Sequence, residues 1–370
     1  MKVALFTLGG TIASTGATGG VVPKLTGADL LASVPGLAQA SVTLQVHDFR
    51  QVPSASLAVG DVLDLVRAIR AEVAAGADGV VVSQGTDTIE ETAFLADLLY
   101  GGDGPVVFTG AMRNPTLAGA DGPANLQAAV TVAASPQARG LGCVVVFGDE
   151  IHAARFVAKA HTTSVTAFIS PPAGPLGFVA EDRVILLTRP ARWAALPDPQ
   201  PDPQLGSPVR TGLVTMVLGD DGALLEAAAG LYSGLVVAGF GAGHVPGPIV
   251  AMLGQAAQRI PVVLASRTGA GMVLAGTYAF PGSELDLRQR GLIGAGFLEP
   301  LKARLLLHVL LAAGASRDAI AATFAAVAAD LAGPALFTRS GAGARRPRRC
   351  PAAGPRRGRS LRPARCHPGT

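Results

Sequence analysis

The feature that most constrains the fold of this chain is a series of short apolar runs, bounded by glycine, that alternate with helical patterns. Four such runs lie at residues 2–10, 79–85, 104–111 and 142–149. Each run is continuously apolar, as is typical of parallel strands covered on both faces. The pattern also predicts helices over 60–75 and 88–100. Strands that alternate with helices predict a doubly wound α/β sheet.

A stretch rich in Pro and Asp, residues 193–208, interrupts this alternation and is predicted to be an interdomain linker. The α/β pattern then resumes and closes with an apolar helix over 297–314. We therefore expect a two-domain protein, with a larger N-terminal catalytic α/β domain over 1–192 and a smaller C-terminal α/β domain over 209–333.

The last segment, residues 334–370, differs in composition from the rest of the chain. It holds ten arginines and no acid from Arg339 onward, which leaves 20 basic and 26 acidic residues before it. With almost no large apolar residues, it is expected to be disordered. One interpretation is an arm that binds nucleic acid or another anionic surface. The other is a segment that results from translation of a shifted, GC-rich reading frame. We favour the second interpretation and expect no nucleic-acid partner.

Several classes of protein are excluded by what the sequence lacks. No apolar run reaches the roughly 18 residues of a membrane span, and no cleavage site follows the N-terminal run. We therefore expect a cytoplasmic protein with no membrane partner. The cysteines, Cys143, Cys350 and Cys366, match neither a disulfide framework nor a zinc site. The glycine patterns of dinucleotide and phosphate loops are missing too, so we expect no metal and no cofactor.

Two polar motifs follow predicted strands in the first hundred residues. In "GGTIAS" the glycines expose Thr11 at the end of a strand, although Gly-Gly-Thr alone is more typical of a turn. In "SQGTDTIEETAF" Asp87 and Glu90 fit a helix capping box, which does not explain Gln84, Thr86 and Thr88 together. The start of a helix also stabilises negative charge, so this motif can hold a carboxylate or an oxyanion.

Two further motifs occupy the same kind of position. Residues 108–130 contain a polar loop in which Asp121 or Asn125 can cap the following helix. Residues 153–168 contain Lys159, one of only four lysines, in apolar surroundings that favour the neutral amine needed for base chemistry; a solvated surface charge is the ordinary alternative. Open parallel sheets bind ligands where their strands end, so the four motifs together predict a site.

Taken together, these motifs resemble the bacterial-type L-asparaginase family, whose members are amidohydrolases with a threonine nucleophile. The resemblance covers residues 2–333 and rests on "GGTIAS", "GTDTIEETA", "TGAMR", "GADGPANL" and "GPLGF", in that order, with "GFGAGHVP" and "GLIGAGFLEPLKARLLL" in the second domain. It implies hydrolysis of L-asparagine to L-aspartate and ammonia through an acyl-enzyme.

The same resemblance implies roles for individual residues. Thr11 is the implied nucleophile, Lys159 acts on Thr86, and Asp87 anchors the α-ammonium of the substrate; which threonine attacks first stays open. Four residues are implied to bind substrate: Ser54, Asp87, Ala111 and Glu284. Ser54, which a turn after a proline explains equally well, would hold the α-carboxylate. Ala111 would lie near the substrate amide.

Glu284, in "FPGSELDL", matches an acid that reaches into the site of a neighbouring subunit. That match implies a homo-oligomer built from close dimers, commonly a tetramer.

The chain departs from the family pattern in three places. Residues 16–30 lack the tyrosine of the family's mobile lid, so the activator of Thr11 is unassigned, with Ser14, Thr15 or Thr18 as candidates. Gln84 stands where many members have histidine, and Ala55 replaces a frequent glutamine. These changes predict weak or absent glutaminase activity.

Two other functions stay open at this point. One is an amidotransferase subunit that supplies ammonia for transfer-RNA-linked amidation, although its family carries an extra domain ahead of the first motif. The other is a non-catalytic protein that binds or senses asparagine, which the missing lid tyrosine favours and the set of two threonines and a lysine does not.

Deleting every residue after 338 should leave the melting temperature and the activity unchanged, because an unpacked terminus contributes nothing to the core. Thermal unfolding and an amide-hydrolysis assay of the shortened chain measure both quantities. A clear loss of either would mean that the tail belongs to the fold.

Overall fold

The structure is a computed structural model of the chain. It describes residues 1–15, 22–23, 26–32, 34, 42–171, 173–199 and 209–328, all of which belong to one unit of contacts, Met1–Leu336. The expected disordered tail, 334–370, and the second half of the expected linker, 200–208, lie outside the described residues.

The N-terminal sheet has the strand order β12-β11-β8-β7-β6-β5-β1-β4. Five strands run parallel: β4 (Thr43–Asp48), β1 (Lys2–Thr7), β5 (Gly79–Ser83), β6 (Val106–Thr109) and β7 (Cys143–Phe147). The last four coincide with the apolar runs that predicted them. The expected α/β class is therefore confirmed for this part of the chain.

The other three strands run antiparallel, so the sheet is mixed: β8 (Glu150–Ala153), β11 (Gly177–Ala180) and β12 (Arg183–Leu186). A two-residue turn at 148–149 joins β7 and β8 in a hairpin, and another at 181–182 joins β11 and β12. All four turn residues have φ between 50° and 65°. Positive φ at both central residues is the geometry of a tight hairpin turn. The Gly-Asp pair at 148–149 is the sequence signal that could have predicted the first of them.

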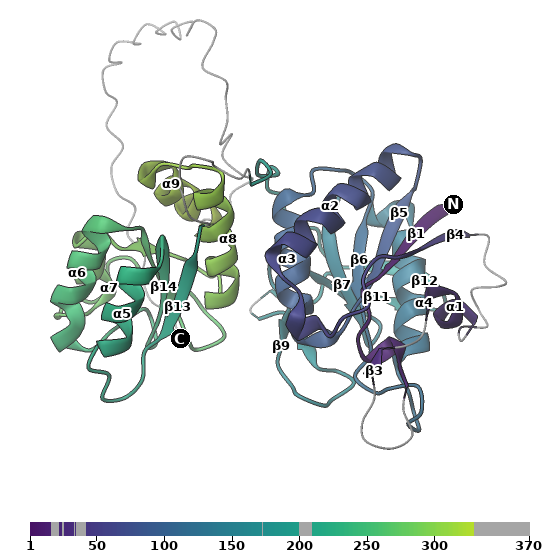
Figure 1. Cartoon of the computed structure of the whole chain (residues 1–370), viewed down its shortest axis with the longest axis horizontal. Coiled ribbons are helices and arrows are strands. Elements are labelled where there is room, and N and C mark those ends of the chain that lie inside the picture. The colour runs from purple at the N-terminus through teal and green to yellow at the C-terminus, as the bar shows by residue number, and fades with distance from the viewer. Residues whose placement is uncertain are drawn as a thin grey trace, which may run out of the picture. The chain divides into compact units, whose positions relative to one another are not determined.

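Helices cover both faces of this sheet, because alternate strand residues point to opposite sides. α2 (Val59–Ala74) and α3 (Ile89–Leu99) pack on one face. α1 (Gly27–Ala32) and α4 (Gly122–Ala133) pack on the other (Figure 1). α2 and α3 confirm the helices expected at 60–75 and 88–100.

The C-terminal sheet is smaller and parallel, in the order β13-β14-β15-β16. Its strands are β13 (Thr211–Thr215), β14 (Gly234–Gly239), β15 (Val262–Ser266) and β16 (Ile293–Gly294). α5 (Ala223–Leu231), α6 (Val250–Arg259) and α7 (Glu284–Gln289) pack on one face. α8 (Pro300–Ala312) and α9 (Arg317–Ala328) pack on the other. The expected second α/β fold is confirmed, and α8 lies within the apolar helix predicted for 297–314.

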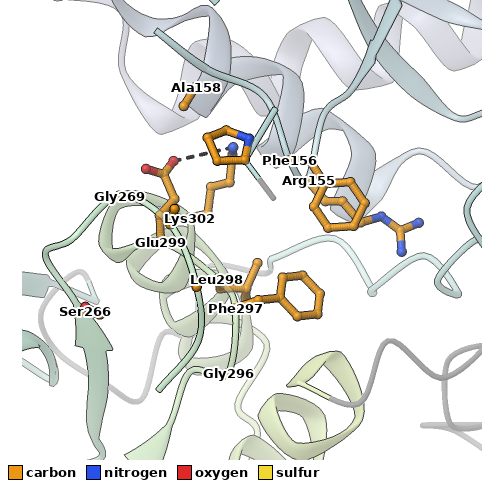
Figure 2. Close-up of a pocket in the computed structure, with 13 residues that line it drawn as sticks. Arg155, Phe156, Ala158, Ser266, Gly269, Gly296, Phe297, Leu298, Glu299 and Lys302 are labelled. Carbon is orange, nitrogen blue, oxygen red and sulfur yellow. Dashed lines mark ion pairs between the residues drawn. The ribbon is translucent and has the colours of Figure 1, made fainter. Parts of the chain in front are cut away.

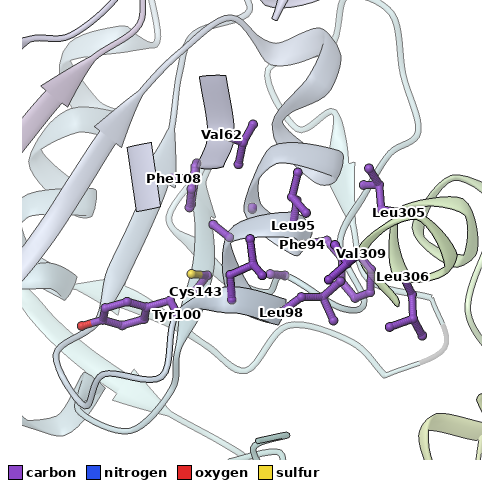
Figure 3. Packing of buried hydrophobic residues seen from close by; sticks show 14 of the residues in the cluster. Val62, Phe94, Leu95, Leu98, Tyr100, Phe108, Cys143, Leu305, Leu306 and Val309 are labelled. Carbon is purple, nitrogen blue, oxygen red and sulfur yellow. The ribbon is translucent and has the colours of Figure 1, made fainter. Parts of the chain in front are cut away.

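One hydrophobic cluster joins the helices of the two sheets. Phe94 and Leu98 of α3 belong to the same cluster of buried side chains as Leu306 and Val309 of α8 (Figure 3). Fully burying a large apolar side chain contributes about 1.5–3 kcal/mol. The two parts of the chain are therefore held by a continuous core.

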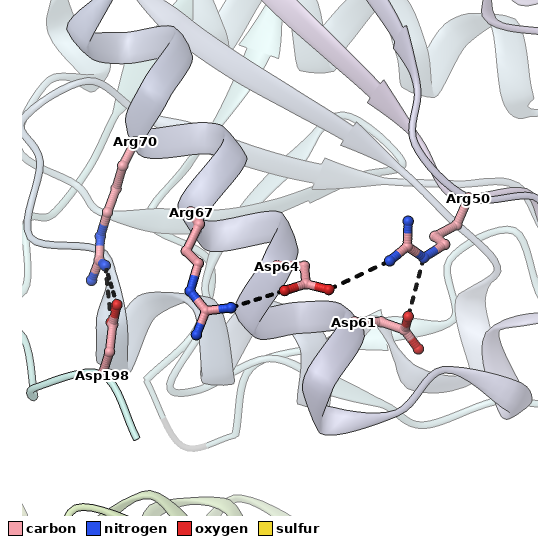
Figure 4. Close-up of polar contacts among 6 residues, drawn as sticks. All are labelled: Arg50, Asp61, Asp64, Arg67, Arg70 and Asp198. Atoms are coloured by element: carbon pink, nitrogen blue, oxygen red, sulfur yellow. Dashed lines mark hydrogen bonds and ion pairs between the residues drawn. The ribbon is translucent and has the colours of Figure 1, made fainter. Parts of the chain in front are cut away.

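Polar contacts fix the segments that border α2 (Figure 4). Arg50, which follows β4, pairs with Asp61 in the first turn of α2 at 3.1 Å. Asp198, in the described half of the expected linker, pairs with Arg70 at 2.8 Å, and the Leu196 amide donates to the Leu98 carbonyl at 2.7 Å. Exposed ion pairs stabilise a fold by at most about 1 kcal/mol each. Together with the backbone hydrogen bond, the Asp198 ion pair shows that residues 193–199 pack against the N-terminal part of the chain.

None of the helices in the described part of the chain has both the length and the apolar character that crossing a membrane requires.

The connection between β1 and β5 determines where a ligand site can form. The chain leaves β1 for β4 on one side and then returns to β5 on the other side, so the strand order reverses between β1 and β5. The backbones that follow these two strands touch: a Cβ on Gly10 would lie 2.1 Å from the Gly85 nitrogen. Gly10 also has φ of +91°, which disfavours any side chain.

Gly10→Ala should therefore destabilise the protein by roughly 4 kcal/mol or more, since backbone strain and a backbone clash add. Gly76→Ala is the matched control: Gly76 has φ of +95°, but nothing lies within 4 Å of its added Cβ. We expect that control to cost only the strain, about 1–2 kcal/mol. Urea unfolding of both variants measures the difference, and equal losses would contradict the close approach of the two backbones.

Candidate active site

The turns after β1 and β5 carry the two candidate threonines. Thr11 begins a 3-10 turn, Thr11–Ala13, and is half-buried. Thr86 begins a second 3-10 turn, Thr86–Thr88, that leads directly into α3, and its side chain is buried. The contact between Gly10 and Gly85 brings these turns side by side.

Lys159 joins the second turn from a distant part of the sequence. It ends the short strand β9 (Ala158–Lys159), and its Nζ donates to Thr86 Oγ1 at 2.9 Å and to Asp87 Oδ1 at 2.7 Å. The Lys159 side chain is 14% exposed, whereas that of Asp87 is 67% exposed. The Lys159 side chain is therefore mostly buried, while its partner Asp87 is exposed to solvent.

The expected capping box at this helix is wrong. The N-cap of α3 is Thr88, which makes no side-chain capping hydrogen bond. Asp87 instead pairs with Lys159, and the buried Glu90 accepts the backbone N–H of Lys159 at 2.8 Å. The role of Glu90 was missed because the lysine lies 69 residues further along the chain.

Ser54 lies against the same backbone. It is buried at the start of a 3-10 turn, Ser54–Ser56, and a Cβ on Gly85 would lie 2.6 Å from Ser54 Oγ. The Thr88 hydroxyl donates to the Ser54 carbonyl at 3.1 Å. The three segments that carry Thr11, Ser54 and Thr86 therefore meet around the Gly10–Gly85 contact.

The loop that contains Ala111 borders this cluster. Ala111 is buried, and the adjacent Gly110 packs close to the Thr86 methyl group. Asp121 accepts the backbone N–H groups of Met112 and Arg113 at 3.0 and 2.8 Å. Asn125 donates to the Gly110 carbonyl at 3.0 Å.

The expectation that Asp121 or Asn125 caps the following helix is confirmed for the position of Asp121 but not for a capping side-chain contact. Asp121 occupies the N-cap position of α4 without a side-chain capping hydrogen bond, and both side chains hold the Ala111 loop instead.

The residues that depart from the family pattern have different surroundings. Gln84 is fully buried beneath the Thr86 turn, where its amide nitrogen donates to the Thr92 hydroxyl at 3.2 Å. Ala55 is exposed. The side chains of Ser14, Thr15 and Thr18, the candidate activators of Thr11, lie outside the described part of the structure.

Glu284 begins α7 in the C-terminal part of the chain, away from the segments that carry the other predicted residues, and its expected reach into a neighbouring subunit stays a prediction. Its side chain is fully buried in its own chain, where Oε1 accepts the backbone N–H groups of Thr277 and Tyr278 at 2.7 and 2.8 Å. Burial alone would raise the pKa of Glu284, but these hydrogen bonds and the nearby His244 outweigh it and lower the pKa. The other oxygen, Oε2, lies 3.3 Å from His244 Nε2.

The arrangement suits covalent chemistry on an acyl group. A hydroxyl in contact with an ammonium or amine group, at the start of a helix whose N–H groups stabilise negative charge, is typical of sites that activate a nucleophile and hold an oxyanion. Within the described residues, His, Cys, Asp and Glu form no group of three that could hold a metal ion.

Two family models together match most of this chain. Residues 2–192 match the family model described as "Asparaginase, N-terminal", and residues 210–324 match the "Glutaminase/Asparaginase C-terminal domain" model. The chain belongs to the asparaginase family.

Relatives within the asparaginase family match over much of this chain. A probable L-asparaginase from Deinococcus radiodurans is 39% identical, over 87% of this chain and 97% of the relative. A probable periplasmic L-asparaginase from Haemophilus influenzae is 37% identical, over 67% of this chain and 70% of the relative. The crystal structure of a probable cytoplasmic L-asparaginase from Campylobacter jejuni has a TM-score of 0.76 at 30% identity, covering 88% and 99% of the two chains.

The burial of Glu90 makes stability depend on pH. Burial and the nearby Glu299 carboxylate raise the pKa of Glu90 to about 7, although the hydrogen bond from the Lys159 N–H and the charge of Lys302 lower it in part. Between pH 4.5 and 7 the unfolded state releases this proton while the folded state keeps it, so Glu90 destabilises the fold increasingly as pH rises.

Glu90→Gln should therefore stabilise the protein at pH 8 by on the order of 2–3 kcal/mol, and the gain should shrink towards pH 5. Chemical unfolding at both pH values measures it. Glu226→Gln makes the same change at an exposed position of α5 and should give no such trend. A gain from Glu90→Gln that grows towards pH 5 would contradict the raised pKa.

Proposed function

We propose that this chain is an L-asparaginase that hydrolyses the side-chain amide of L-asparagine to L-aspartate and ammonia through a threonine nucleophile. The observation that carries the proposal is the contact of Lys159 with both Thr86 and Asp87, beside the turn that begins with Thr11. Membership of a family whose relatives are named L-asparaginases supports the same substrate.

In the first step, the Thr11 hydroxyl attacks the amide carbon of the substrate. The hydroxyl proton passes to the amide nitrogen, the C–N bond breaks and ammonia leaves, so that an aspartyl ester of Thr11 remains. The negative charge on the carbonyl oxygen would be stabilised by backbone N–H groups at the start of the Thr86 turn and α3.

In the second step, water attacks the ester carbon and the bond to Thr11 breaks, which releases aspartate and restores the hydroxyl. Thr86 is the group proposed to orient and deprotonate this water, with Lys159 as its proton partner. The short distance between Lys159 and Thr86 supports this role, because a base must lie within hydrogen-bond reach of the group it activates.

Substrate recognition is assigned to groups of opposite charge and to the backbone. Asp87 keeps a largely exposed carboxylate, which suits the α-ammonium of asparagine. Ser54 is proposed for the α-carboxylate, and the backbone at Ala111 for the amide group. Weak or absent activity on glutamine remains part of the proposal, although the buried Gln84 would act on it only through the Thr86 turn.

Two wider properties rest on the family alone. We propose a homo-oligomer, a dimer of dimers, which sedimentation would test, and the expected reach of Glu284 into a neighbouring subunit is part of that proposal. We also propose a cytoplasmic location. The relatives include one protein named cytoplasmic and one named periplasmic, so cell fractionation is needed to test this location.

Thr11→Ala should abolish ammonia release from millimolar L-asparagine, with a loss of at least about 10³-fold, because the nucleophile is gone. Thr131→Ala is the control, since it removes a hydroxyl from α4 that has no proposed role. A coupled ammonia assay measures both variants beside the wild type. No release by the wild type would favour the binding or sensing function, and full activity of Thr11→Ala would refute this nucleophile.

A further inference from the structure

We infer that Glu90 is a positioning residue, which holds the backbone of Lys159 so that its Nζ reaches Thr86 and Asp87. This inference rests on the proposed function of Lys159. It adds a residue that does not itself touch the substrate.

The first observation is the direct contact. Glu90 lies in the first turn of α3, is 8% exposed, and its Oε2 accepts the Lys159 N–H at 2.8 Å. Thr86, which binds the Lys159 Nζ, lies four residues earlier, in the turn that leads into the same helix. One rigid segment thus contacts both the backbone and the side-chain end of Lys159.

The second observation is that the strand carrying Lys159 needs outside support. β9 pairs only with β10 (Phe168–Ile169) in the described sheets, as a two-stranded ribbon separate from both main sheets. Two-stranded ribbons are marginally stable by themselves. The orientation of Lys159 must therefore come from contacts outside the ribbon.

The third observation is a contact between the C-terminal part of the chain and the residues just before Lys159. Lys302 of α8 is fully buried, pairs with Glu299 at 3.4 Å, and donates through Nζ to the Val157 carbonyl. Figure 2 shows Lys302 and Glu299 with Ala158 around one pocket. Glu90 and Lys302 thus fix the residues on either side of Ala158.

Glu90 holds Lys159 in either protonation state. Burial raises its pKa to about 7, yet a protonated carboxyl keeps an oxygen that accepts the Lys159 N–H. A glutamine has that same oxygen and nearly the same shape, whereas a methionine fills the space without an equivalent acceptor. This difference separates positioning from mere packing.

The test compares Glu90→Met with Glu90→Gln in the full chain. Glu91→Met is the matched control, because it makes the same change one residue along α3, at a glutamate that is partly buried and does not contact the Lys159 N–H. Backbone hydrogen exchange of the Lys159 N–H is measured first, since it does not depend on any activity. We expect exchange to quicken at least tenfold in Glu90→Met and to stay as in the wild type in the other two.

Asparagine turnover is measured second, with kcat and KM separated. Glu90→Met should lose on the order of 10- to 100-fold in kcat with little change in KM, as expected when a reacting group is displaced by about 1 Å. Glu90→Gln should restore kcat. In a Lys159→Ala background, Glu90→Met should cause no additional loss, because Glu90 acts only through Lys159.

Wild-type exchange of the Lys159 N–H in Glu90→Met would overturn the inference, as would unchanged kcat in Glu90→Met or an equal loss of kcat in the Lys159→Ala background. A wild type that releases no ammonia would refute the proposed function instead, and the exchange measurement would still decide whether Glu90 holds Lys159.

Discussion

The close approach of two backbones, at Gly10 and Gly85, is the constraint on which the arrangement of the site depends. Both residues follow parallel strands at the point where the strand order reverses, and neither position has room for a Cβ. Because the backbones touch, the two threonines that follow them begin adjacent turns. Ser54 packs against the same contact from a third segment. The position of the site is therefore set by main-chain packing before any side-chain chemistry.

The charged groups around Lys159 divide into an open side and a closed side. The exposed Asp87 contacts the Nζ of Lys159 from the solvent side, while Glu90 contacts the Lys159 backbone from the buried side. The buried carboxylate is costly to ionise and tends to hold its proton near neutral pH. The exposed Asp87 carboxylate is the group proposed to bind the α-ammonium of the substrate.

Much of the fold and most of the gathered residues could be predicted from the sequence, for physical reasons. Strands buried on both faces leave continuous apolar runs, and Thr11 and Thr86 follow such runs directly. The strands β8, β11 and β12 escaped prediction because each is only four residues long, and because β11 and β12 are also partly exposed. The contact between Glu90 and Lys159 joins residues 69 positions apart, and the burial of Glu284 depends on a loop folding over it. Neither leaves a local signal.

The hydrogen bond from Lys302 to the Val157 carbonyl has a consequence for how this chain can be divided. Every side chain proposed for the chemistry lies before residue 192, within the first family model. One support of the strand that carries Lys159 nevertheless comes from α8, within the second. The two halves are therefore not independent modules. An isolated N-terminal half would contain all the proposed reactive groups but would lack the hydrogen bond from Lys302 that supports the strand carrying Lys159.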